Sequence, residues 1–317
     1  MSIVRTSLIA AAVSGAALMS AATAQAAPTV LSTELAPTRV AAWEGTVMWS
    51  KFDPATGNYQ LVKSIDGGAP TSVAVPQRAG GPFDIDLGTN RSGSTFAVYT
   101  RGGDIYRLNV RTSVEGKIDK LSSPTIAERD PTIQRGEIAF IRRDGGYDQL
   151  RIGNTTSASK GSRMIVKKRS ILSAELGNRH VAYVEQVPAD FREVQVHIRN
   201  LSTGNDARVY RARSGGANAA DVTRPSYIAS PEAFVWARTN LGSGTGNRLV
   251  RYTLRGSKFA YAQGSPFYNS ASWAGETLGA ATASTLDNGE TQGACADVGR
   301  NYCVVELTGP LSFTLRP

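Results

Sequence analysis

The sequence is poor in the residues that most often carry catalytic and metal chemistry. Its 317 residues include two histidines, two cysteines and four methionines. Zinc clusters and nucleophile–histidine couples need several such residues close together, so we expect no metal site, no cofactor and no catalytic residue. Charged residues make up 19% and apolar residues 41%, which excludes both an acidic disordered chain and a bundle of membrane helices.

Long hydrophobic runs are also missing, apart from one near the N-terminus. Residues 8–19 form an apolar, alanine-rich stretch that is too short to span about 30 Å of hydrocarbon. Arg5 precedes it, and Ala24-Gln25-Ala26 follows with the small residues that a signal peptidase requires. We therefore predict a signal peptide over residues 1–26, no transmembrane segment, and a secreted or periplasmic mature chain. An uncleaved N-terminal anchor is the alternative.

The two cysteines fit an oxidising location. Cys295 and Cys303 lie close together in the sequence, without a second pair or a Cys-x-x-Cys motif. Disulfides persist outside the cytosol, and a short loop closed in this way gains about 2.5 kcal/mol on the chain-entropy model. We expect a structural disulfide between them.

A short apolar segment of alternating character recurs about every 46 residues. A turn rich in Gly, Asp, Asn or Pro follows each copy, then a second strand, a turn containing glycine and a third strand. In five of the six units, a proline-led segment precedes the recurring copy and supplies a fourth short strand. The recurring copies are Thr46–Trp49, Phe96–Tyr99, Ile138–Ile141, Val181–Val184, Phe234–Ala237 and, more weakly, Leu278–Ala281.

Four short strands per unit and no helical periodicity predict antiparallel meanders that stack around one axis. We expect residues 27–317 to form a single all-β domain, a six-bladed β-propeller of four-stranded antiparallel blades. Five good blades followed by an irregular tail is the alternative, because the last unit is the weakest. The spare segment Thr29–Glu34 is expected to pair near the C-terminal blade and to fasten the ring.

One unit resembles a known repeat. The run from Asp130-Pro131 to Ile138-Ala139-Phe140 is similar to the propeller repeat of the TolB-type, WD-repeat-like family, and Arg224-Pro225 to Trp236 is a looser copy. The resemblance implies a periplasmic binding propeller. We expect no counterpart of the α/β domain that precedes the propeller in TolB, because only about ten residues separate the predicted cleavage site from the first unit.

Asp84 and Asp86 are candidate channel carboxylates. They are two residues apart on an expected innermost strand, so both would face the same side, toward the channel. Such a pair could hold a hard cation such as Ca²⁺. Arg39, Arg129 or Arg224 on other innermost segments could instead neutralise it, and we expect no metal there.

Charge is unevenly distributed along the chain. Residues 101–260 contain 27 basic and 15 acidic residues, while the whole chain has a net charge of +9. Arg163, Lys167, Lys168 and Arg169 form a local run and a possible anion-binding surface. The alternative is a solvated sheet edge, where cations discourage aggregation. Nucleic acid is not an expected partner, because no recognition motif accompanies the charge.

These features favour an exported, non-enzymatic scaffold that binds an envelope protein or an anionic envelope polymer. A secreted glycan hydrolase or lyase, with carboxylates at the channel mouth, is the alternative. A purely structural stabiliser of the envelope is a third, weaker possibility. The sequence does not specify the ligand, the rim that binds it or the oligomeric state.

Overall fold

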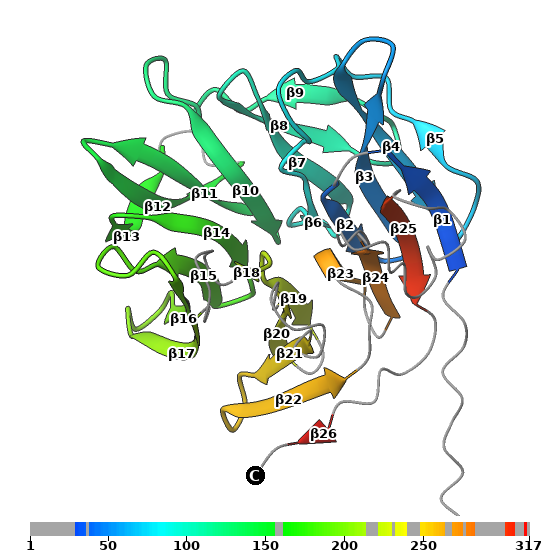
Figure 1. Cartoon of the computed structure of the whole chain (residues 1–317). Helices are drawn as coiled ribbons and strands as arrows, with labels where there is room; N and C mark the ends of the chain where they lie inside the picture. The colour runs from blue at the N-terminus through cyan, green and yellow to red at the C-terminus, as the bar shows by residue number, and fades with distance from the viewer. Residues whose placement is uncertain are drawn as a thin grey trace, which may run out of the picture.

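Antiparallel sheets surround a common centre in the computed structural model (Figure 1). The structure describes residues 29–35, 38–155, 161–213, 221–229, 232–239, 248–263, 268–274, 277–282, 302–307 and 314–315. The predicted signal peptide, residues 1–26, lies outside these ranges. Among the described residues, no helix has the length and apolar character needed to cross a membrane.

Four of the blades follow one another directly along the chain, each with its strands in sequence order. Blade 1 comprises β2 (Val40–Trp43), β3 (Thr46–Asp53), β4 (Asn58–Ile65) and β5 (Thr71–Ser72). Blade 2 comprises β6 (Asp86–Thr89), β7 (Thr95–Arg101), β8 (Asp104–Asn109) and β9 (Glu115–Lys117). Blade 3 comprises β10 (Glu128–Gln134), β11 (Glu137–Asp144), β12 (Tyr147–Asn154) and β13 (Arg163–Lys168). Blade 4 comprises β14 (Ile171–Leu176), β15 (His180–Gln186), β16 (Glu193–Asn200) and β17 (Asp206–Arg213).

The closing blade joins the two ends of the chain. It contains β23 (Tyr268–Ala274), β24 (Thr277–Thr282), β25 (Tyr302–Leu307) and, as its outermost strand, β1 (Thr29–Glu34). The predicted pairing of Thr29–Glu34 with the C-terminal blade is confirmed, since Val30 pairs with Val305 and Thr33 with Cys303. The Glu34 carboxylate also accepts a hydrogen bond of 2.7 Å from the Trp49 indole nitrogen, which fastens β1 to blade 1.

The prediction of six four-stranded blades is wrong. The propeller has five four-stranded antiparallel blades, and the remaining sheet has six strands. That sheet contains β18 (Asp221–Val222), β19 (Ser226–Ala229), β20 (Glu232–Thr239), β21 (Arg248–Thr253), β22 (Lys258–Gln263) and β26 (Thr314–Leu315).

Two local features explain the departure. Pro225 has no backbone N–H, and the inner edge of the sheet is interrupted between β18 and β19, which both pair with β20. At the outer edge, β26 pairs with β22. Thr314–Leu315 thus belongs to the six-stranded sheet, and β1 takes the outer place in the closing blade.

The hydrophobic core lies between neighbouring sheets. One cluster joins blades 1 and 2 through Met48, Leu61, Phe83 and Tyr99. Corresponding clusters lie between blades 2 and 3, between blades 3 and 4, between blade 4 and the six-stranded sheet, and between the closing blade and blade 1. Blades 1 to 4 therefore bury both faces, which a single short meander could not do alone. Near the axis the strands approach so closely that a Cβ on Gly88 would lie 2.1 Å from the carbonyl oxygen of Ile133.

Candidate functional site

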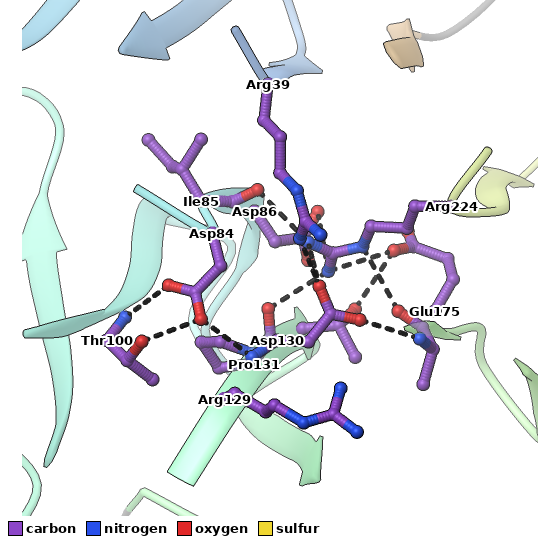
Figure 2. Close-up of polar contacts among 12 residues, drawn as sticks. Arg39, Asp84, Ile85, Asp86, Thr100, Arg129, Asp130, Pro131, Glu175 and Arg224 are labelled. Carbon is purple, nitrogen blue, oxygen red and sulfur yellow. Dashed lines mark hydrogen bonds and ion pairs between the residues drawn. The ribbon is translucent and has the colours of Figure 1, made fainter. Parts of the chain in front are cut away.

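Asp84 and Asp86 lie at the inner edge of blade 2, where both carboxylates reach the innermost strand of blade 3 (Figure 2). Asp84 is 7% exposed and Asp86 5%. Asp84 Oδ2 accepts the backbone N–H of Asp130 at 2.7 Å, and Asp86 Oδ2 accepts that of Ile133 at 2.8 Å. Thr100 adds two more hydrogen bonds to Asp84, from its backbone nitrogen and its hydroxyl.

The same type of bond recurs around the ring. Asp130 Oδ2 accepts the backbone N–H of Ala174 at 2.8 Å, and Thr132 Oγ1 accepts that of Leu176 at 3.1 Å. One sheet further on, Glu175 Oε1 accepts the N–H of Tyr227 at 3.3 Å. Inner strands of neighbouring sheets do not pair with each other through a β-ladder, so their backbone N–H groups need other acceptors. Side chains from one inner segment supply these acceptors to the next inner strand.

Asp130 adopts an unusual backbone conformation to take part in this arrangement. Its φ is 53°, and the pairing between β10 and β11 shifts register between Arg129 and Thr132. Aspartate tolerates the left-handed region better than most residues. The bulge before Pro131 places the Asp130 carboxylate, which is almost fully buried, between blade 4 and the axis.

Arg224 occupies the centre of the cluster and comes from the six-stranded sheet (Figure 2). Its guanidinium nitrogens lie 3.3 Å from Glu175 Oε2, 3.6 Å from Asp130 Oδ1 and 3.8 Å from Asp86 Oδ1. They also donate to the main-chain carbonyls of Ala174, Ile85 and Pro131, at 3.1, 3.2 and 3.0 Å. We call Asp84, Asp86, Asp130, Glu175 and Arg224 the axial cluster.

Two further arginines border the axial cluster at greater exposure. Arg39 Nη1 lies 2.5 Å from Asp130 Oδ1, and its side chain is 37% exposed. Arg129 turns to Asp148, with 2.9 Å between Nη2 and Oδ2, and donates to the Ile171 carbonyl at 2.6 Å. Of the three arginines considered from the sequence as counter-charges for the aspartates, Arg224 reaches Asp86, whereas the ion-pair partner of Asp84 is Arg78 at 3.1 Å.

Burial and neighbouring charges shift the pKa values of the axial carboxyl groups in different directions. Burial raises the pKa of Glu175 well above its usual range, and the neighbouring Asp86 carboxylate adds to the effect. Burial also raises the pKa of Asp86, against the opposing influence of Arg224. Burial acts on Asp130 in the same sense, but Arg224 and Arg39 together hold the pKa of that carboxyl below its usual value.

Sequence reasoning missed Asp130 and Glu175. Asp130-Pro131 was noted as part of a repeat, but not as the counterpart of Asp84 at the start of the neighbouring inner strand. Aligning the proline-led segments would not have matched the two, because Asp84 follows Pro82 whereas Asp130 precedes Pro131. Glu175 follows no proline, and the sequence contains no comparable signal for it.

The four cations of the predicted anion-binding surface do not lie together. Arg163 starts β13, while Lys167 and Arg169 lie near its other end, around the ring of Tyr147. Lys168 is paired with Glu185 at 2.7 Å. Arg163 instead borders a groove of about 570 Å³ between blades 2 and 3, lined also by Arg91, Glu137, Asn154 and Ser162.

The remaining predicted features are only partly placed by the structure. Cys295 lies outside the described residues and Cys303 is in β25, so the disulfide stays a prediction. His197 stacks on Tyr183, with ring centroids 4.9 Å apart, and His180 begins β15. Among the residues described, no three His, Cys, Asp or Glu side chains are arranged so that they could hold a metal ion.

Comparison with known proteins shows the fold. No model of a protein family matches the chain, and no curated protein matches it in sequence. Among solved structures, an oligogalacturonate lyase in complex with manganese is similar, with a TM-score of 0.54 and 13% identity over 82% of this chain and 78% of the lyase. TolB from Acinetobacter baumannii has a TM-score of 0.53 and 12% identity, over 85% of this chain and 65% of TolB.

A second oligogalacturonate lyase, from Vibrio parahaemolyticus, has a TM-score of 0.52 and 8% identity, over 87% of this chain and 78% of the lyase. Identities this low show a shared propeller architecture and do not assign an activity.

Proposed function

We propose that this chain is an exported, non-enzymatic binding scaffold of the cell envelope, related to the TolB-type propellers. One observation carries the proposal: the carboxylates gathered at the axis are already engaged in holding neighbouring sheets together. Asp84, Asp86, Asp130 and Glu175 each accept a backbone N–H from an adjacent inner strand. Arg224 fills the space between three of them.

A catalytic carboxylate has to exchange partners with a substrate during the reaction. In the axial cluster such an exchange would leave buried backbone donors unsatisfied, at a cost of about 1–3 kcal/mol each. It would also separate Arg224 from its counter-charges in a site that water reaches poorly. These costs support a structural role for the cluster and leave binding to the rims.

The alternative is a glycan lyase or hydrolase. The similarity to two oligogalacturonate lyases favours it, because a propeller of this shape supports that activity in those proteins. The groove beside Arg163, with Arg91 and Glu137 in its lining, offers a place for an acidic sugar. This reading predicts that the purified chain shortens polygalacturonate.

Three measurements test the proposal. N-terminal sequencing of the chain recovered from the envelope or the medium should begin near Ala27; material that still starts at Met1 would contradict cleavage and export. Cross-linking of the tagged chain in intact cells, followed by quantitative mass spectrometry, should identify a reproducible envelope partner. Turnover of polygalacturonate by the purified chain, abolished by a substitution in the Arg163 groove, would replace the scaffold with the lyase.

A further inference from the structure

One exposed surface on blades 3 and 4 combines positive charge with large apolar side chains. We call it the rim patch. It contains Arg143, Tyr147, Lys167, Arg169, Leu172 and Phe191. They lie in or beside the turn between β11 and β12, the connection from β13 to β14, and the loop between β15 and β16. Phe191 is 58% exposed, Leu172 40% and Tyr147 37%, and the three cations are exposed as well.

Contacts within the rim patch centre on Tyr147, and hydrogen bonds link the neighbouring β13–β14 connection to the loop that carries Phe191. Lys167 Nζ lies 4.8 Å from the centre of the Tyr147 ring, and Arg169 Cζ lies 6.0 Å from it. Beside Arg169, the carbonyl of Ser170 accepts the backbone N–H of Gln186 at 3.2 Å. The Gln186 side chain then donates to the carbonyl of Phe191 at 3.0 Å, so Gln186 bridges the β13–β14 connection and the β15–β16 loop.

The accessible charge of the rim patch is positive. Asp148, the carboxylate nearest Arg143 at 3.7 Å, is buried and is shared with Arg129. Glu185 pairs with Lys168, and Asp190 with Arg192 and Arg213. Asp144 is the exposed acid at this turn and accepts a bond from Gln149. Within the described ranges, no carboxylate lies within ion-pair distance of Lys167 or Arg169.

We infer that the rim patch binds an acidic peptide segment of a partner protein, one that also carries apolar side chains. This inference rests on the proposed scaffold function. Arginine, tyrosine and phenylalanine side chains are enriched in protein–protein interfaces, and clusters of cations recognise acidic motifs. An anionic polysaccharide would satisfy the cations but would leave Leu172 and Phe191 in contact with water.

The neighbouring Arg129 shows which groups this part of the surface can bind. Its guanidinium pairs with the Asp148 carboxylate and donates to the main-chain carbonyls of Ile171 and Leu172. Carboxylates and main-chain carbonyls are the two acceptors that an acidic peptide offers. Arg143 and Arg169, more exposed and on the same rim, are positioned to receive such acceptors from outside the chain.

The inference is tested with a random 12-residue peptide library displayed on phage and selected against the whole chain. We expect enrichment of peptides that combine several Asp or Glu residues with Leu, Ile or aromatic residues. Fluorescence anisotropy of the most enriched peptide then compares three variants. The double variant R143E/R169E should weaken binding at least ten-fold, F191A about five-fold, and the control R111E/R208E less than two-fold.

The control arginines are exposed and lie toward the opposite rim, Arg111 in the β8–β9 turn and Arg208 beside the β16–β17 turn. Raising the salt concentration should weaken binding to the unaltered chain and affect R143E/R169E much less. Failure to enrich acidic peptides, or equal binding by R143E/R169E and the control, would overturn the inference. Polygalacturonate binding that is lost in R143E/R169E, without peptide binding, would assign the patch to a glycan.

The cross-linking experiment separates this inference from the scaffold proposal. A chain that captures no envelope partner contradicts the scaffold itself. A partner that R143E/R169E captures as well as the unaltered chain leaves the scaffold intact and overturns the assignment to the rim patch.

Discussion

Arg224 and Glu175 face each other at the propeller axis, with 3.3 Å between a guanidinium nitrogen and Oε2, although they belong to different sheets. The pair is surrounded by Asp86 and Asp130, so a positive charge from the six-stranded sheet compensates carboxylates from blades 2, 3 and 4. This arrangement determines how the ring responds to substitution and to pH.

Replacing Arg224 with alanine should destabilise the protein by about 3–5 kcal/mol, because buried carboxylates would lose their counter-charge. Three main-chain carbonyls would lose a donor in the same substitution. Urea unfolding followed by tryptophan fluorescence measures the change. Arg111→Ala, at an exposed turn, is the control and should shift stability by less than about 0.5 kcal/mol. Similar stabilities for the two variants would show that the axial charges are not structural.

Glu175→Gln should alter the pH dependence of stability. The folded-state pKa of Glu175 is raised above its ordinary value of 4.5. The unfolded chain therefore releases this proton at lower pH than the folded chain, and stability falls as pH rises from about 4.5 through the folded pKa. The glutamine variant lacks this loss and should gain stability relative to the unaltered chain between pH 4 and pH 8. Parallel stability curves over that range would contradict the burial of a proton-binding carboxyl.

Gly88→Ala should destabilise by about 1–3 kcal/mol through overpacking. The new methyl group would meet the carbonyl of Ile133 at 2.1 Å, and a main-chain atom between two inner strands cannot move away easily. Gly116→Ala is the matched control, because nothing lies within 4 Å of the corresponding position in β9. Thermal unfolding should give a clearly lower melting temperature for the Gly88 variant. Equal melting temperatures would mean that β6 and β10 leave room for a methyl group at Gly88.

Glu34 tests the closure of the ring. Glu34→Ala removes the acceptor of the buried Trp49 N–H and should cost about 1–3 kcal/mol. Glu34→Gln keeps an acceptor oxygen for the Trp49 N–H. Burial is the main cause of the raised pKa of the Glu34 carboxyl, so its ionised form is disfavoured in the folded protein, and the glutamine variant should be at least as stable as the unaltered chain at pH 7. Hydrogen exchange of the β25 amides should accelerate in the alanine variant alone. Equal exchange in both variants would argue against fastening through Glu34 and Trp49.

Local patterns in the sequence were sufficient to predict most strands. Thr46–Trp49 and Ile138–Ile141 lie within β3 and β11, where all of these residues are buried, because a short apolar run bounded by turn residues is a local signal for a strand. Closure by Thr29–Glu34 could also be anticipated, since a sheet that lacks one strand needs a partner and this segment was spare. The six-stranded sheet could not be anticipated, because the pairing of Thr314–Leu315 with β22 depends on where segments distant in the sequence meet.

The contacts within the axial cluster could not be predicted from the sequence either. Asp84 and Asp86 were recognised because both lie on one expected strand. Arg224 was named as a possible counter-charge, but its three carboxylate neighbours come from separate blades. Which charges meet across a ring depends on the geometry of closure. The spread of the Arg163–Arg169 run along β13, from one end of the strand to the other, is likewise visible only once the strand is placed.

The most direct test of the central claim is a combined measurement on Asp86→Asn/Glu175→Gln. Both substitutions keep the acceptor oxygens near the positions that bind Ile133 and Tyr227. They remove two of the three carboxyl groups beside Arg224 and leave Asp130 in place. Urea unfolding between pH 4 and pH 8 should reveal an altered pH dependence of stability, while capture of the envelope partner should stay within two-fold of the unaltered chain. The account is contradicted if the stability curve is unchanged while the variant loses partner capture, or loses a glycan turnover that the unaltered chain shows. Either result would mean that the axial carboxylates serve a ligand.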